Sequence, residues 1–381
     1  MEFMYSVPSF VKFGEGVAKN IGEEVKAFGA KKVFLVYDKG VKAAGIVDDI
    51  QASLKAAGID FVEYDGVLPN PPDTIVEKAA ATAKAAGVDA MVAVGGGSSI
   101  DCAKAINILL TNPSPINQYD GIGLVKIPTK PLIAIPTTAG TASEVTGFSI
   151  ITDTTRLKKM VIGGPFVGPT MALVDPLLTV ALPAAITAST GMDALTHAIE
   201  AYVSKGAMIP TDVNALKAIE LIYGNLVKAT KNGKNIEART NMILGSMLAG
   251  FAFNSAVLGL VHSIAHPLSV HCGLPHGVAN ACGLPYVMEF NAVAVPERTK
   301  DIGLAMGLDI ADKSAVKASA ITVQAIKDLA VELDIPKLRN LGVKKEQFDR
   351  VADDALKEIS TMFNPRAVTK KDVLAILELA Y

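Results

Sequence analysis

The sequence predicts a protein with an α/β domain over residues 1–180 and an all-α domain over residues 181–381. Short apolar runs alternate with helical stretches through the first half, which is the pattern of βα units that build a Rossmann-like parallel sheet. After Asp175-Pro176 the strand pattern stops, and the rest of the chain is a succession of helical segments. A chain of 381 residues is also long enough for two domains.

Five apolar runs of the first half are predicted as strands because each is short and bounded by turn residues. They are Val33–Tyr37, Phe61–Tyr64, Ala90–Val94, Leu132–Ile135 and Met171–Val174. Helices are predicted between them at Ala43–Ala57 and Asp73–Ala86, since a glycine follows each. The helices predicted in the second half are Ala184–Val203, Asp212–Leu226, Arg239–Ala265, Lys313–Leu333 and Lys345–Ile359.

The composition narrows the class of protein. The 36 Lys and Arg residues nearly balance the 38 Asp and Glu residues, so no nucleic-acid partner is expected. Only 19% of residues are charged, as expected when subunit contacts bury some surface, and we expect a homo-oligomer. Three cysteines are too few for a disulfide framework, and residues 1–10 lack the features of a signal peptide. These observations predict a cytoplasmic protein.

A long uncharged stretch has two interpretations. Residues 240–288 contain no Asp, Glu, Lys or Arg, and Met242–Val261 is long enough to span a bilayer. The run contains polar residues and glycines, however, and neither an aromatic belt nor a basic cluster flanks it. We therefore expect a buried helix of the all-α domain and no membrane partner.

A glycine-rich loop between a predicted strand and a predicted helix indicates a phosphate-binding site. Gly95-Gly96-Gly97-Ser98 follows the run Val92–Val94, and the helix opens near Asp101. Glycines allow close backbone approach, and the N–H groups at a helix start suit a pyrophosphate. Alternatively, Ser98 caps the helix and Asp101 completes a capping box. The loop is not GxGxxG and follows the third strand, which disfavours an ordinary Rossmann domain.

Other polar residues follow predicted strands at the edge where open α/β sheets bind ligands. Asp38 could accept hydrogen bonds from an adenosine ribose and would repel a 2′-phosphate, which favours NAD over NADP; it could equally be a loop acid or a helix cap. Thr137, Thr138 and Thr141 could hold a ribose or an amide, although Thr141 with Glu144 also fits a capping box.

The five histidines all lie in the helical half, and four of them fall within 15 residues. Asp193 and His197 are four residues apart, so both face one side of a helix, and His262 and His266 repeat this spacing before Pro267 interrupts the helix. His276 adds an imidazole from a loop or helix start. The cluster predicts a divalent metal site, with hydrogen-bonded histidine pairs as the alternative. The absence of thiolate partners suits Fe²⁺, Zn²⁺ or Mn²⁺.

Several long motifs in the same order give the chain a resemblance. It resembles the iron-containing, or group III, alcohol dehydrogenases, near the lactaldehyde reductases (propanediol oxidoreductases) and 1,3-propanediol dehydrogenases, over essentially its whole length. The motifs are Pro69-Asn70-Pro71, Gly95–Ser98 with Asp101 and Lys104, Ile135–Thr141 with Ser143-Glu144, Gly191–Glu200, and Gly259–Gly277. The resemblance implies the fold of dehydroquinate synthase, with an NAD-binding domain followed by a helical metal-binding domain.

The resemblance also implies an activity, which is NAD-linked interconversion of a small primary alcohol or diol and its aldehyde, with Fe²⁺ (or Zn²⁺) as metal. Asp193, His197, His262 and His276 would bind the metal, and His266 would relay the released proton beside the substrate. The implied cofactor residues are Asp38, Asn70, Gly96, Gly97, Ser98, Asp101, Thr137, Thr138, Thr141 and Lys159. His271 and Cys272 stand where family members often carry aromatic residues, and His271 is not expected to bind metal.

Two other classes of protein compete with this interpretation. Glycerol dehydrogenase and dehydroquinate synthase share the fold and are usually zinc enzymes, but a synthase needs a basic pocket for its phosphate-bearing substrate. No Lys or Arg lies near the metal motifs in residues 240–288, which favours a small neutral substrate. A non-enzymatic metal- or nucleotide-binding assembly protein would show no NADH turnover.

Overall fold

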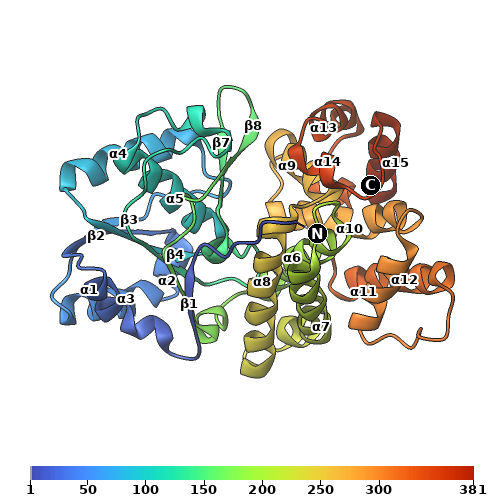
Figure 1. Ribbon diagram of the computed structural model, residues 1–381, viewed down its shortest axis with the longest axis horizontal. Helices are drawn as coiled ribbons and strands as arrows, with labels where there is room; N and C mark the ends of the chain where they lie inside the picture. The colour runs from blue at the N-terminus through green and yellow to red at the C-terminus, as the bar shows by residue number, and fades with distance from the viewer. Residues whose placement is uncertain (1) are drawn as a thin grey trace. The chain divides into compact units, whose positions relative to one another are not determined.

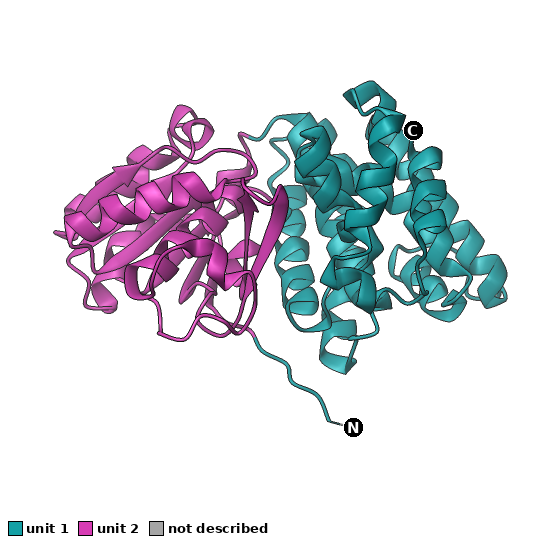
Figure 2. Cartoon of the chain, turned by 90° about the horizontal axis from the view of Figure 1, so that it is seen from above, with its two compact units in different colours: residues 1–6, 139–141, 182–381 teal, residues 7–138, 142–181 magenta. Residues whose placement is uncertain are grey.

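The computed structural model describes residues 2–381, which form two compact units. One unit comprises residues 7–138 and 142–181, and the other comprises the N-terminal residues up to Ser6 together with residues 139–141 and 182–381 (Figure 2). The chain therefore passes from one unit to the other after Ser6, on each side of residues 139–141, and finally between residues 181 and 182.

A six-stranded parallel sheet organises the α/β unit, with the strand order β1-β9-β6-β4-β2-β3 (Figure 1). The strands are β1 (Phe10–Phe13), β2 (Lys32–Tyr37), β3 (Asp60–Tyr64), β4 (Ala90–Gly95), β6 (Leu132–Pro136) and β9 (Met171–Val174). All five predicted strands are present. The sixth, β1, is a short edge strand whose residues are only partly buried or exposed, and it therefore carries little hydrophobic signal.

Helices cover both faces of this sheet. They are α1 (Ile21–Ala27), α2 (Lys39–Ala43), α3 (Ile46–Ala56), α4 (Asp73–Ala86) and α5 (Gly97–Thr111). Successive residues of a strand face opposite sides, so Phe34 and Val36 join the core with α4 and α5, while Val33 and Leu35 join the core with α1 and α3. Helix α4 matches its prediction, and the helix predicted at Ala43–Ala57 corresponds to α3, which begins three residues later. The short helix α2 ends at the first residue of the predicted range and was not predicted.

The register of the central strands brings the predicted loop residues to one edge. Tyr37 of β2 lies opposite Val94 of β4, and Gly95 of β4 lies opposite Pro136 of β6. The segments that begin at Asp38, Gly96 and Thr137 therefore leave neighbouring strands at the same carboxyl edge, which is where open α/β sheets bind ligands.

A second, three-stranded sheet was not predicted. It consists of β5 (Gly121–Ile122), β8 (Lys158–Gly163) and β7 (Phe148–Asp153), and the last two pair antiparallel. In β7 the buried positions include two polar residues, Ser149 and Asp153. Because these polar side chains face inward, the strand lacks the apolar and polar alternation from which strands are recognised.

Helices make up the other unit (Figure 1). They are α6 (Ala184–Val203), α7 (Ile209–Lys231), α8 (Ile236–Ala256), α9 (Leu260–Cys272), α10 (His276–Ala292), α11 (Pro296–Ala305), α12 (Ala315–Glu332), α13 (Phe348–Ala355), α14 (Ile359–Phe363) and α15 (Lys370–Ala380). Helix α6 matches its prediction, α7 is longer at both ends, and the helix predicted at Lys345–Ile359 is a 3-10 turn followed by α13.

Two predictions about the uncharged stretch are wrong. The single helix predicted at Arg239–Ala265 is two helices, because α8 ends before Val257, which has a positive φ of 63°, and α9 leaves it at an angle of 101°. Pro267 does not interrupt α9, which continues to Cys272. Within residues 2–381 no single helix is long and apolar enough to cross a membrane, whereas α8 and α9 pass that test only as a bent pair.

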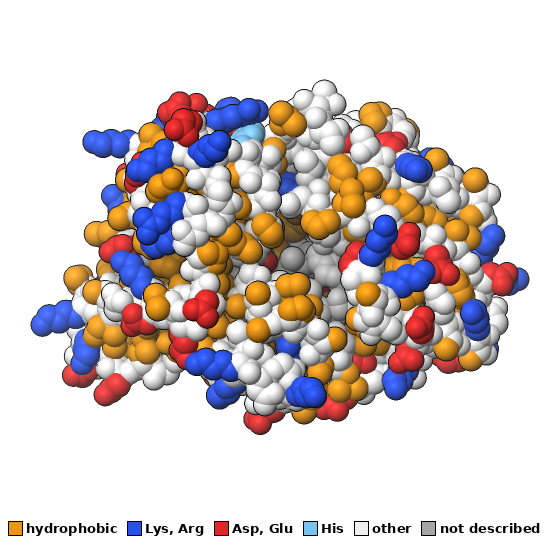
Figure 3. Space-filling model, turned by 180° about the vertical axis from the view of Figure 1, so that it is seen from behind, with side chains coloured by type: hydrophobic (Ala, Val, Ile, Leu, Met, Phe, Trp, Pro, Cys, Tyr) orange, Lys and Arg blue, Asp and Glu red, His pale blue; other side chains and the backbone are white. Residues whose placement is uncertain are grey.

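The surface carries charges of both signs. Lys and Arg side chains are interspersed with Asp and Glu side chains on the face drawn in Figure 3, in keeping with the formal net charge of -2.

Candidate metal centre and cofactor-binding edge

The glycine-rich loop starts α5 without a side-chain cap. Gly96 is the N-cap residue and Gly97 the first helical residue, so the predicted alternative of a Ser98 cap with an Asp101 capping box is wrong. Gly95 has a φ of 145°, and a Cβ on it would lie 2.6 Å from Ser99 Oγ, so only glycine fits there. The first N–H groups of α5 thus lie at a helix start where the cap residue supplies no side-chain acceptor, as a phosphate site requires.

Asp38 lies beside this loop and also caps a helix. Its Oδ1 accepts hydrogen bonds from the backbone N–H groups of Gly40 (2.8 Å) and Val41 (3.1 Å) at the start of α2. Its Oδ2 accepts a hydrogen bond of 3.0 Å from the Ser99 hydroxyl of α5. The helix-cap interpretation is therefore correct, and the same bonds hold the carboxylate at the edge where a ribose would bind.

Asp101, in the first turns of α5, is largely but not fully buried, with 13% of its side chain exposed. It accepts hydrogen bonds from the Ser143 hydroxyl (2.5 Å) and the Ile150 N–H (3.2 Å), and the Lys104 ammonium lies 3.6 Å away. Burial raises the pKa of Asp101 and lowers the pKa of Lys104 to about 8. These contacts tie α5 to β7, and direct contact of Asp101 with a cofactor stays a prediction.

Of the other predicted cofactor residues, Asn70 and Lys159 bond to each other, and Thr137 and Thr138 lie beside the glycine-rich loop. Asn70 accepts a hydrogen bond of 2.7 Å from the Lys159 ammonium. The Thr137 N–H donates to the Gly95 carbonyl at 3.1 Å, and the Thr138 side chain lies so near Gly96 that a Cβ there would be 3.2 Å away.

Thr141 belongs to the short stretch 139–141 that is grouped with the helical unit. The capping box expected of Thr141 and Glu144 is wrong, because the 3-10 turn Ser143–Val145 has Ala142 as its N-cap and no side-chain cap.

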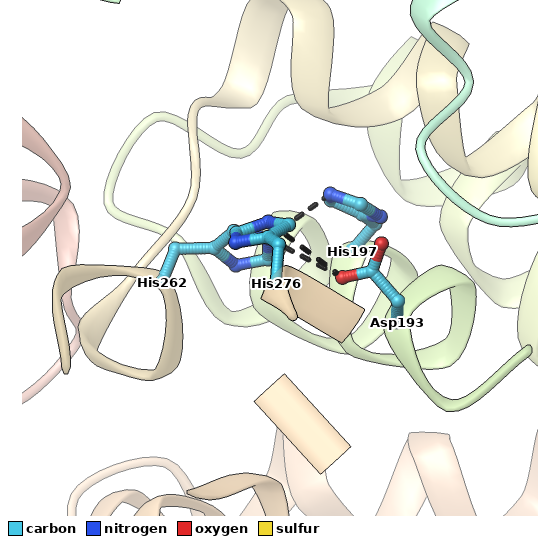
Figure 4. Close-up of side chains that lie close together, drawn as sticks. All are labelled: Asp193, His197, His262 and His276. Carbon is cyan, nitrogen blue, oxygen red and sulfur yellow. Dashed lines mark hydrogen bonds and ion pairs between the residues drawn. The ribbon is translucent and has the colours of Figure 1, made fainter. Parts of the chain in front are cut away.

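Four side chains of the helical unit converge on one point. Asp193 and His197 lie one turn apart on α6, His262 is on α9, and His276 is the first residue of α10. Each offers one ligand atom, and these atoms all lie within 4.8 Å of one another. Figure 4 shows the three imidazoles and the carboxylate pointing toward one another, with Asp193 Oδ1 3.9 Å from Nε2 of both His262 and His276. Of the four, only His276 is more than marginally exposed.

Glu200 supports this cluster, and sequence reasoning did not identify it. It is buried on α6, one turn beyond His197, and accepts hydrogen bonds from His262 Nδ1 (2.6 Å) and from the Gly259 and Val261 N–H groups (3.0 and 2.6 Å). Burial raises its pKa to about 7. Its i,i+3 spacing from His197 was the available signal. Because His262 Nδ1 bonds to Glu200, Nε2 is the ring atom turned to the cluster.

The four residues fit a divalent metal ion. Three imidazoles and one carboxylate, without a thiolate, are donors that Fe²⁺, Mn²⁺ and Zn²⁺ accept. Burial, with His197 and His266 nearby, holds the pKa of the His262 imidazole well below its usual range, so this ring keeps a lone pair for a metal. Among the described residues, two of the few buried side-chain atoms without a partner belong here, His197 Nδ1 and Asn280 Oδ1.

Two family models together match most of the chain. Residues 8–176 match the family model for iron-containing alcohol dehydrogenase, and residues 187–381 match the model for the C-terminal part of the Fe-containing alcohol dehydrogenase family. The chain belongs to the iron-containing alcohol dehydrogenase family. The resemblance inferred from the motifs and the class of enzyme are thereby confirmed.

Individual relatives of this iron-containing alcohol dehydrogenase span its full length. It is 44% identical to the 1,3-propanediol dehydrogenase of Klebsiella pneumoniae over 100% of this chain and 99% of that one. The crystal structure of a 1,3-propanediol oxidoreductase superposes with a TM-score of 0.97 and 43% identity, covering 100% of both chains. The crystal structure of the sulfoacetaldehyde reductase of Bifidobacterium kashiwanohense in complex with NAD⁺ superposes with a TM-score of 0.88 and 31% identity. The match covers 100% of this chain and 99% of that one. The predicted fold class is confirmed.

In this iron-containing alcohol dehydrogenase the two remaining histidines lie outside the group of four. His266 is nearby, with its ring centroid 5.4 Å from that of His276, and its Nδ1 lies 3.1 Å from Glu358 Oε2. His271 pairs instead with Asp354, at 2.8 Å from Nε2 to Oδ2. The structure thus separates His271 from the candidate metal ligands.

Proposed function

We propose that this protein is a Fe²⁺-dependent, NAD-linked oxidoreductase that interconverts a small primary alcohol or diol and its aldehyde. The observation that carries the proposal is the convergence of Asp193, His197, His262 and His276, whose ligand atoms lie within 4.8 Å of one another. The family to which the chain belongs supports iron as the metal.

These four residues would hold the metal, and the ion would act as a Lewis acid on a substrate oxygen. The protein's part is to prepare the site. Glu200 orients the His262 ring through Nδ1, and the neighbouring Phe253 ring stacks on His197 with 4.5 Å between centroids. We assign proton transfer to His266, since an imidazole can both accept and donate a proton and Glu358 holds one of its ring nitrogens, Nδ1.

The cofactor assignment rests on the carboxyl edge of the α/β unit. The start of α5 suits the pyrophosphate, with Gly96 as its N-cap and Gly97 and Ser98 as its first residues. Asp38 suits the adenosine ribose and repels a 2′-phosphate, which favours NAD over NADP. A related structure with NAD⁺ bound, that of the sulfoacetaldehyde reductase, supports the same choice.

The substrate assignment rests on charge. Residues 240–288, which include His262, His266 and His276, contain no Lys or Arg, so nothing in this stretch would recognise a phosphate or carboxylate substrate. This supports a neutral alcohol or diol and disfavours a dehydroquinate synthase activity. The similarity to a 1,3-propanediol dehydrogenase places short diols first among the substrates to test.

The test is reduction of NAD⁺ under anaerobic conditions, followed through the absorbance of NADH. Protein stripped of metal with a chelator is reloaded separately with Fe²⁺ and Zn²⁺ and offered a series of short alcohols and diols. His262→Ala is the site variant. His271→Ala is the matched control, because His271 bonds to Asp354 and lies outside the candidate ligand group.

We expect turnover that needs metal, is faster with Fe²⁺, and is lost in His262→Ala but kept in His271→Ala. A protein that binds NAD⁺ and metal yet oxidises no alcohol would contradict the proposed reaction. Equal turnover without metal would contradict the metal centre.

We also propose a cytoplasmic homo-oligomer. The low share of charged residues, 19%, supports burial of surface between subunits, and the three cysteines are all free thiols. Light scattering of the purified protein tests the oligomeric state, and a monomer at all concentrations would contradict a homo-oligomer.

A further inference from the structure

Asn280 projects into the group of candidate metal ligands. It lies on α10, four residues after His276 and therefore on the same side of the helix, and its side chain is 0% exposed. Its amide Nδ2 is 2.5 Å from Asp193 Oδ1 and 3.1 Å from Nε2 of both His262 and His276. One amide group thus contacts three of the four candidate ligands.

The orientation of this amide follows from its nearest neighbour. With the two ends exchanged, the amide oxygen would face the Asp193 carboxylate oxygen at about the same short distance, and two acceptors repel each other. The nitrogen therefore faces Asp193. In this orientation Asn280 Oδ1 is buried and has no partner among the described residues. An unpaired buried oxygen costs free energy, so the contact with Asp193 is not explained by stability of the fold alone.

The oxygen that Asn280 holds is the one that faces the imidazoles. Asp193 Oδ1 lies 3.9 Å from Nε2 of His262 and of His276. Rotation about the last bond of an aspartate side chain is soft, so without a hydrogen bond the carboxylate could turn either oxygen, or neither, toward the ion. Donation from Asn280 removes this freedom.

The backbone holds the two residues at a fixed separation. A Cβ on Gly277, at the start of α10, would lie 3.0 Å from the Ser189 carbonyl of α6 and 3.5 Å from Asp193 Cβ. Glycine therefore permits close contact between the two helices beside the site. A site built on closely packed helices holds its geometry better than one built on loops.

We propose that Asn280 is a positioning residue of the metal centre, which orients the Asp193 carboxylate for the divalent ion through the hydrogen bond from Nδ2 to Oδ1. The inference rests on the proposed function, because it takes Asp193 as a metal ligand. Asn280 itself is not assigned as a ligand. Hydrogen bonds to ligating side chains commonly contribute a factor of about 10 to 100 in metal affinity, and we expect that range here.

The experiment compares two leucine substitutions in the full-length protein. Asn280→Leu keeps the approximate size of the side chain and removes the donor. Asn291→Leu is the matched control, because Asn291 is buried on the same helix and its amide bonds to Asn364, not to a candidate ligand. The affinity for Co²⁺ is measured by competition with a chelator, the visible spectrum of the Co²⁺ protein reports ligand geometry, and thermal unfolding is followed in excess chelator.

We expect Asn280→Leu to bind Co²⁺ about 10- to 100-fold more weakly and to alter the visible spectrum. Asn291→Leu should lower thermal stability while leaving the affinity and spectrum unchanged. Asn280→Ser, which keeps a shorter donor, should give an intermediate affinity and keeps the test open where the leucine variant does not fold. Unchanged affinity and spectrum in Asn280→Leu or Asn280→Ser would overturn the inference.

A failure of the proposed function looks different. If the wild-type protein binds no Co²⁺, or if His262→Ala binds it as tightly as the wild type, the metal centre itself is refuted and the inference with it. If the wild type binds Co²⁺, His262→Ala does not, and Asn280→Leu binds normally, only the role of Asn280 is refuted.

Discussion

The Lys159 ammonium donates a 2.7 Å hydrogen bond to Asn70 Oδ1 and so joins two residues 89 positions apart. The family resemblance implied both residues in cofactor binding, and the structure brings their side chains together within the α/β unit. Lys159 is only 5% exposed, and burial lowers its pKa to about 8, although the nearby Asp101 carboxyl raises it again in part. A cation with this pKa beside a dinucleotide would make binding depend on pH.

We therefore predict that affinity for NAD⁺ falls as the pH rises above about 8. The anionic pyrophosphate favours the charged form of Lys159, so above its pKa binding must include uptake of a proton, and affinity drops by up to about tenfold per pH unit. Lys159→Met should bind NAD⁺ weakly at all pH values and lose this slope, as measured by calorimetry. Lys158→Met is the control, since the Lys158 side chain is about half exposed and its ammonium pairs with Asp120. An equal slope in Lys159→Met would exclude Lys159 as its source.

Two substitutions of Asp38 separate its roles as helix cap and as cofactor contact. Asp38→Asn keeps an acceptor for the Gly40 and Val41 N–H groups but removes the charge, so stability should hold while preference shifts toward NADP⁺. Asp38→Ala should shift the preference and also lose about 1 kcal/mol of unfolding free energy. Steady-state kinetics with both cofactors and chemical denaturation measure the two effects. Unchanged discrimination in both variants would remove Asp38 from the cofactor site.

Loss of the Glu200 carboxylate should weaken metal binding. In Glu200→Gln the amide cannot accept from His262 Nδ1 and from both N–H groups of α9 together, so the ring is no longer held with Nε2 free for metal. We expect about 10- to 100-fold weaker binding of Co²⁺ in a chelator competition. Asp301→Asn, which affects only the bond from the Tyr202 hydroxyl, is the matched control and should bind normally. Tight binding in Glu200→Gln would show that His262 needs no such partner.

His266 and Glu358 should act together in turnover without holding metal. We expect His266→Ala to lower kcat by about 10²-fold or more, the usual range for a proton-transfer group, with metal content and KM nearly unchanged. Glu358→Ala should lower kcat less, and Glu358→Gln should restore part of it because the amide oxygen still accepts from Nδ1. Asp354→Asn, at the corresponding partner of His271, should leave kcat unaltered. Loss of bound metal in His266→Ala would assign this residue to the metal centre instead.

Interactions between neighbours in the chain were predictable from the sequence. The i,i+4 spacing of Asp193 and His197 places both on one side of α6, because a helix fixes the relative direction of residues one turn apart. The strands with continuous apolar runs, such as Ala90–Gly95, were predictable for a similar reason, since a strand buried on both faces needs apolar residues at every position.

Two features that were not predicted depend on hydrogen bonds to residues far away in the sequence. Strand β7 was missed because Ser149 and Asp153 face inward, where Ser149 donates to the Asp101 carbonyl at 2.8 Å and Asp153 accepts from Asn117 and Arg156. The break between α8 and α9 was missed because no charged residue marks it. The backbone N–H groups at the start of α9 donate instead to Glu200, 59 to 61 residues earlier, and to Asn364, 104 residues later.

The sequence by itself determined the order of the two kinds of domain, the glycine-rich loop, and the residue types that make up the candidate metal centre. Each of these depends on the spacing of residues that are close in the chain. In a helix or strand of known periodicity, that spacing fixes the side on which each side chain lies. Only the tertiary structure decided that Asn280 bonds to Asp193, that Glu200 orients His262, and that Asp38 is held by Ser99. These contacts join side chains from separate segments of the chain, and their distances depend on how those segments pack, which no local pattern encodes.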